Sequence, residues 1–131
     1  MGLSTDDLVA IQQLYARYNH AIDFGDAEAW AACLTPDGRM IAKGTGDFQG
    51  TEALTAFAKS MAAQINGRHW TNNLLVEGSG AGATAKCYLL FVRNGAAGHA
   101  PSVVLSGVYT DTLAKGPSGW KFAARDFAPD A

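Results

Sequence analysis

This sequence contains no long run of residues with the same charge. Its 131 residues include 10 Lys and Arg and 12 Asp and Glu, which gives a formal net charge of −2. Binding to DNA or RNA depends on clustered cations that neutralise phosphates. Because no such cluster is present, we expect no nucleic-acid partner.

Long apolar runs are absent as well. No segment approaches the roughly 18 apolar residues that a membrane-spanning helix requires. The N-terminal sequence MGLSTDDL is typical of a helix cap rather than of a secretory signal. We therefore expect a cytoplasmic protein with no membrane partner.

Motifs that hold metals, nucleotides or disulfides are also missing. The two cysteines, Cys33 and Cys87, have neither CxxC nor metal-ligand spacing, so we expect buried free thiols in a reducing compartment. The sequence contains no HExxH, no histidine cluster, no GxGxxG and no phosphate-binding loop. We expect a cofactor-free protein, so any reaction would use side chains alone.

Apolar residues, in contrast, are plentiful, at 48% of the sequence. A chain of this length forms one domain, residues 1–131, that buries about two thirds of the surface of its unfolded state. No repeat or linker divides it. The core is large enough to contain a small cavity.

The most informative segment is a helix predicted over residues 5–23. Ser4 is a suitable N-cap, acidic residues occupy the first turn, and Gly25 follows the end. At 100° per residue one apolar face carries two phenols, with Asn19 and Asp23 on its edge. That face consists of Leu8, Ile11, Leu14, Tyr15, Tyr18, Ala21 and Ile22. We interpret it as the floor of a pocket.

Short elements are expected next. Asp26 can cap a second helix over residues 27–34, and a turn at 35–38 leads to a short strand at 39–42. The glycine-rich segment 44–50 is interpreted as a mobile loop at the mouth of the pocket. A third helix begins at Thr51, follows the apolar spacing of Leu54, Phe57, Met61 and Ile65, and stops at Asn66-Gly67.

From residue 69 the apolar pattern changes to period two. Strands are predicted over 69–77, 83–93, 102–115 and 120–127, joined by short connections that suit an antiparallel meander. The predicted fold is α+β, with three N-terminal helices packed in a curved, cone-shaped mixed or antiparallel sheet around an internal pocket. Apolar residues on both faces of the middle strands predict a homo-oligomer, a trimer or a dimer.

Asp23 needs a partner, because a carboxylate in the last turn of a helix is disfavoured by the helix dipole. Of the three histidines, His20 faces the opposite side of the helix and His99 lies in a loop, whereas His69 opens a strand. A carboxylate that holds a histidine ring fixes its tautomer and makes it a general base. Asp23 and His69 could be such a dyad, or a purely structural pair.

Several motifs together resemble a known family. They are RY followed after four residues by DxGD, then DG, FxG, a helix, and RHxxxN at a strand start. This chain resembles the SnoaL-like group of the nuclear-transport-factor-2-like cone fold. The nearest patterns are those of bile-acid 7α-dehydratase, scytalone dehydratase and hexachlorocyclohexane dehydrochlorinase. The resemblance implies roles for Asp23, His69 and Tyr18 in catalysis and, more weakly, for Arg125 in the last strand.

Other candidates follow from strand parity and apolar character. Asn73 shares parity with His69, so it could face the pocket and bind a substrate oxygen, or bond to nearby backbone. Arg125 could reach the pocket or form a surface ion pair, and Tyr18 could be a core tyrosine. Apolar candidates for substrate contacts are Tyr15, Trp30, Phe57, Met61 and Leu89.

The resulting hypothesis is a cofactor-free lyase, a dehydratase or dehydrohalogenase that acts on a small hydrophobic cyclic molecule. One alternative is a non-catalytic ligand-binding or scaffold protein. Another is a cyclase or isomerase acting on a polyketide-like ring. A steroid isomerase is disfavoured, because Ala42 stands where a carboxylate base is needed.

Overall fold

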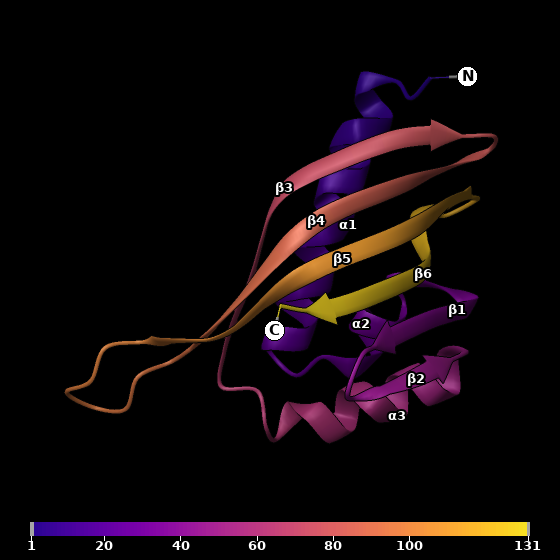
Figure 1. Cartoon of the computed structure of the whole chain (residues 1–131). Coiled ribbons are helices and arrows are strands. Elements are labelled where there is room, and N and C mark those ends of the chain that lie inside the picture. The colour runs from indigo at the N-terminus through magenta and orange to yellow at the C-terminus, as the bar shows by residue number, and fades with distance from the viewer. Residues whose placement is uncertain (1, 131) are drawn as a thin grey trace.

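The computed structural model describes residues 2–130 and contains three helices and six strands (Figure 1). In chain order they are α1 (Thr5–Asp23), α2 (Ala27–Ala31), β1 (Leu34–Ala42), β2 (Gly46–Gln49), α3 (Thr51–Ala62), β3 (Gly67–Ser79), β4 (Gly82–Arg93), β5 (Ser102–Gly116) and β6 (Gly119–Pro129). The expected helix over 5–23 and the four long strands are confirmed.

Helix α1 begins with a capping box. The Asp7 amide donates to the Ser4 hydroxyl, and the Ser4 amide donates to the Asp7 carboxylate. Asp7 also accepts hydrogen bonds from Lys115 Nζ at 2.9 Å and Trp120 Nε1 at 3.0 Å. These bonds fasten the start of α1 to the β5–β6 hairpin.

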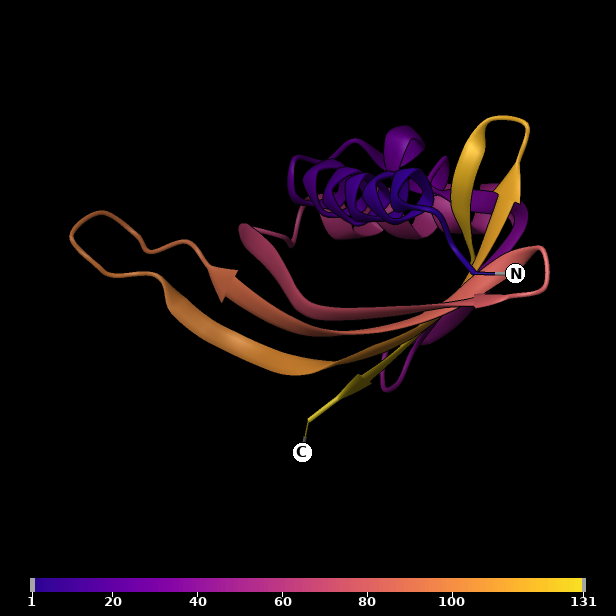
Figure 2. The same ribbon diagram turned by 90° about the horizontal axis from the view of Figure 1, so that it is seen from above.

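The six strands form one mixed sheet in the order β2-β1-β6-β5-β4-β3. Strands β3 to β6 make the predicted antiparallel meander, and β1 pairs parallel with β6. Figure 2 shows that the sheet curves strongly and that the helices lie on its concave side. The predicted α+β cone fold is therefore confirmed, with an open rather than closed sheet.

The first half of the chain departs from two expectations. Helix α2 ends at Ala31 rather than continuing to Leu34, because the Phe122 amide donates to the Cys33 carbonyl and starts the pairing of β1 with β6. The expected turn at 35–38 falls within the bounds of β1, where pairing with β6 is interrupted between Leu34 and Arg39. The supposed mobile loop at 44–50 contains β2, which pairs with β1. Arg39 and Asp47, on these paired strands, form an ion pair.

The β4–β5 connection, residues 94–101, extends well away from the body of the molecule (Figures 1 and 2). Its root is held beside the start of β3, where the Asn94 amide donates to the Asn66 carbonyl at 2.8 Å. No helix within residues 2–130 is long and apolar enough to cross a membrane.

Candidate functional site

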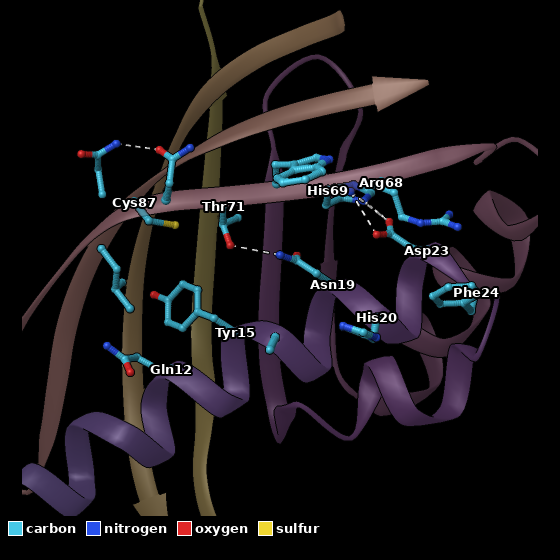
Figure 3. A pocket seen from close by; sticks show the side chains of 15 residues that line it. Gln12, Tyr15, Asn19, His20, Asp23, Phe24, Arg68, His69, Thr71 and Cys87 are labelled. Atoms are coloured by element: carbon cyan, nitrogen blue, oxygen red, sulfur yellow. Dashed lines mark hydrogen bonds and ion pairs between the residues drawn. The ribbon is translucent and has the colours of Figure 1, made fainter. Parts of the chain in front are cut away.

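Asp23 and His69 are brought together by the end of α1 and the start of the edge strand β3. His69 Nδ1 lies 2.5 Å from Asp23 Oδ1, and the His69 backbone N–H donates to Asp23 Oδ2 at 3.0 Å (Figure 3). Because an ionised carboxylate can only accept, Nδ1 is the donor in this bond, and in the neutral imidazole the lone pair of Nε2 is then free. The same carboxylate therefore caps the edge strand and selects the histidine tautomer.

Both side chains of this pair are largely withdrawn from water. The Asp23 side chain is 4% exposed and that of His69 is 15% exposed. Phe91, directly opposite on β4, places its ring 4.8 Å from the imidazole. An imidazole held this way can accept a proton at Nε2 while the carboxylate stabilises the resulting cation.

His69 lines a cavity of about 290 Å³ that is partly open to solvent, which we call the inner cavity. This volume is at the lower end of the range of about 300 to 1,000 Å³ that is typical of small-ligand sites. Five residues singled out from the sequence also line it: Tyr18, Trp30, Phe57, Met61 and Leu89. Most of the remaining wall is apolar, so the cavity suits a small hydrophobic molecule.

Tyr18 supplies a phenol to this cavity. Burial raises the pKa of Tyr18 to about 12, although the nearby Arg125 cation opposes the rise. The hydroxyl is thus protonated at neutral pH and can act as a donor. It donates to Met40 Sδ at 3.6 Å. Sulfur is a weak acceptor, so an oxygen atom of a ligand could readily replace it.

Arg125 neither lines the inner cavity nor forms a surface ion pair, the two positions that the sequence suggested. It is fully buried, and its Nε and Nη2 donate to Asp111 at 2.9 and 3.0 Å. The physical reason is register, since Asp111 and Arg125 are direct partners on β5 and β6. The guanidinium carbon lies within 5 Å of four aromatic ring centroids, those of Tyr15, Tyr18, Tyr109 and Phe122.

Tyr15 belongs to this buried ion pair rather than to the inner cavity. Its hydroxyl donates to Asp111 Oδ2, and burial raises its pKa. Sequence reasoning missed Asp111. The available signal was parity, because Asp111 alternates with the buried Tyr109 and Leu113 on β5.

Asn73 does not line the inner cavity, but it does line a second hollow, between α1 and β3, that His69 and Asp23 also line. Asn73 is exposed and adopts a positive φ of 55°, and the β3–β4 register shifts between Asn72 and Leu75. Such a bulge turns the following side chains, so parity with His69 is lost. Asn73 Nδ2 instead donates to Asn72 Oδ1 at 2.7 Å.

His69 also lines, together with Asp23, a second hollow of about 610 Å³ between α1 and β3, which we call the outer groove (Figure 3). Here Asn19 Nδ2 donates to Thr71 Oγ1 at 3.0 Å, joining the helix to the strand. His69 is thus in the wall that both hollows share.

The chain belongs to the SnoaL-like domain family, whose pattern it matches over residues 4–126. Among curated proteins, none matches this sequence.

Solved structures support this assignment. A variant of a Mycobacterium tuberculosis protein of unknown function is 35% identical, with 94% of this chain and 71% of that chain covered and a TM-score of 0.87. A Nostoc punctiforme protein of unknown function with a cystatin-like fold is 25% identical, with 99% and 96% covered and a TM-score of 0.89. A protein from Catenulispora acidiphila, in complex with S-DNPA, is 26% identical, with 97% and 96% covered and a TM-score of 0.83.

Proposed function

We propose that this protein is a cofactor-free lyase that eliminates water or a comparable leaving group from a small hydrophobic cyclic substrate. The observation that carries the proposal is the hydrogen bond between Asp23 and His69 Nδ1 at the wall of an apolar cavity that also contains a phenol. A base and an acid at one cavity are the two groups that an elimination requires.

In the proposed reaction His69 Nε2 takes a proton from a substrate carbon. The electron pair of that C–H bond forms the new double bond as the bond to the leaving group breaks. Tyr18 donates its hydroxyl proton to the departing oxygen, and Asp23 stabilises the imidazolium. Return of the proton from the imidazolium to the Tyr18 phenolate, through the released water, restores the starting state.

The size and walls of the inner cavity support the substrate class. A volume of about 290 Å³ accommodates a molecule of one or two rings, and Trp30, Phe57 and Leu89 offer it apolar surface. That the relative from Catenulispora acidiphila is a complex with S-DNPA supports ligand binding by this fold.

The test is a panel of cyclic alcohols and cyclic halides, each incubated with the protein and analysed for loss of water or halide. The wild type, His69→Gln and Asp23→Asn should be compared with His20→Gln, which changes an exposed histidine on the same helix as Asp23. The proposal expects turnover by the wild type and His20→Gln only.

Two results would favour the alternatives. Compounds that bind tightly but emerge unchanged from prolonged incubation would indicate a ligand-binding protein. A product of unchanged mass but altered bonding would indicate a cyclase or isomerase.

A further inference from the structure

The inner cavity has a charged group at its mouth as well as His69 in its wall. Lining residues that are also solvent-exposed mark this mouth: Thr45, Gln64, Arg93, Val104 and Leu105. Among them only Arg93 carries a charge. Within residues 2–130 no Asp or Glu lines the cavity.

Arg93 has no acidic partner in the described chain. The four ion pairs within residues 2–130 all involve other groups. An arginine guanidinium presents paired donors whose spacing matches a carboxylate. At the edge of an apolar cavity, a guanidinium can bind the anionic group of a ligand near water while the apolar part of the ligand is buried.

The position of Arg93 relative to His69 is fixed by the sheet. Leu89, Phe91 and Arg93 alternate along β4 and all line the cavity, and Phe91 is the direct partner of His69. Arg93 lies two residues further along the strand, which places its backbone about 7 Å from the level of the dyad.

The strand end that carries Arg93 is also held in place. Its pairing partner is Gly67, where a Cβ would lie only 2.2 Å from the Val92 carbonyl oxygen, so the two strands approach closely there. Beyond it, Asn94 is bonded to Asn66 through backbone and side chain, at 2.8 and 3.1 Å. The backbone of Arg93 is therefore held in a fixed position at the cavity mouth.

We propose that the ligand of the inner cavity is a cyclic carboxylic acid whose carboxylate binds Arg93 while its ring enters the cavity toward His69. The distance of about 7 Å along β4 between the levels of Arg93 and His69 corresponds to about one substituted ring between the carboxylate of the ligand and its reacting carbon. This proposal rests on the proposed function only in taking the inner cavity as the ligand site, and it does not require turnover.

The experiment measures binding of 2-naphthoate and of its neutral counterpart 2-naphthamide by fluorescence titration. The full-length protein should bind the carboxylate about tenfold more tightly than the amide, and added salt should reduce that preference. Arg93→Gln should abolish the preference. Arg17→Gln is the matched control, because Arg17 is exposed on α1 and does not line the cavity.

A third variant locates the probe. Ala42 lines the inner cavity, so Ala42→Phe should fill it and weaken both probes alike, with circular dichroism used to verify folding. Equal affinity for the two probes, a preference that survives Arg93→Gln, or no binding of either probe at millimolar concentration would overturn the proposal. If the wild-type protein eliminates nothing from any compound tested but still prefers the carboxylate, the proposed lyase function fails while the proposed ligand class stands.

Discussion

Asp111 accepts two hydrogen bonds from Arg125 inside the protein, where neither side chain is exposed to water. Removal of one member leaves an uncompensated buried charge, whereas replacement of both leaves an apolar core. The pair also lies behind two phenols, since the Arg125 guanidinium carbon is 4.5 Å from the Tyr18 ring centroid and 3.6 Å from that of Tyr109. Because Tyr18 and Tyr109 line the inner cavity, loss of the ion pair should also change the shape of the cavity wall.

We expect Arg125→Met to lower the free energy of unfolding by about 3 to 5 kcal/mol, because the buried Asp111 carboxylate then loses its counter-ion. The double variant Arg125→Met with Asp111→Leu should be less destabilised than Arg125→Met alone. Urea unfolding measures both effects. Losses that add in the double variant would show that the two side chains do not act as a pair.

The dyad should behave as one catalytic unit. His69→Ala, Asp23→Asn and the double variant should lose similar amounts of kcat, since removal of either member disables the base. Thermal unfolding of each variant separates this effect from misfolding. If the two single losses multiply in the double variant, Asp23 and His69 contribute independently and the dyad mechanism fails.

Tyr18→Phe should lower kcat more than it changes KM, because the proposed hydrogen bond to the leaving group strengthens as charge develops there. A pKa of about 12 keeps the Tyr18 hydroxyl protonated below that pH, so the rate should show no loss assignable to Tyr18 between pH 7 and pH 10. A fall in wild-type rate near pH 10 that disappears in Tyr18→Phe would contradict this assignment.

Asp7 should make stability depend on acid pH. Hydrogen bonds from Lys115, the Ser4 backbone and Trp120 hold the pKa of Asp7 well below its usual value. A depressed folded-state pKa stabilises the fold above the unfolded value of about 4, and this contribution is lost as pH falls below it. Asp7→Asn should therefore reduce Tm at pH 7 and matter progressively less toward pH 2, while Asp6→Asn serves as the control.

The convex face of the sheet should form contacts between copies of the chain. Trp70 on β3 is 60% exposed and Tyr88 on β4 is 52% exposed, and large exposed apolar groups commonly mark interfaces. Light scattering should detect a trimer or dimer at micromolar concentration, which Trp70→Lys weakens. A wild-type monomer would refute this prediction, and Phe24→Lys, which changes an exposed aromatic residue at the end of α1, is a suitable control.

The sequence determined the features that depend on neighbours along the chain. The cap at Ser4, the apolar face of α1 and the period-two strands each follow from local spacing, and the structure contains all of them. The proximity of Asp23 and His69 was also predictable, because Asp23 needed a partner and His69 was the one histidine at a predicted strand start.

Only the tertiary structure decided the features that depend on pairing between distant segments. Arg125 is buried because its register partner is Asp111, and Asn73 is exposed because a bulge opposite β4 reverses the alternation of side chains. The segment 46–49 is a strand because β1 already lies beside β6 and offers it an edge. Local spacing carries no record of register, and a shift of one residue moves every following side chain to the other face of the sheet.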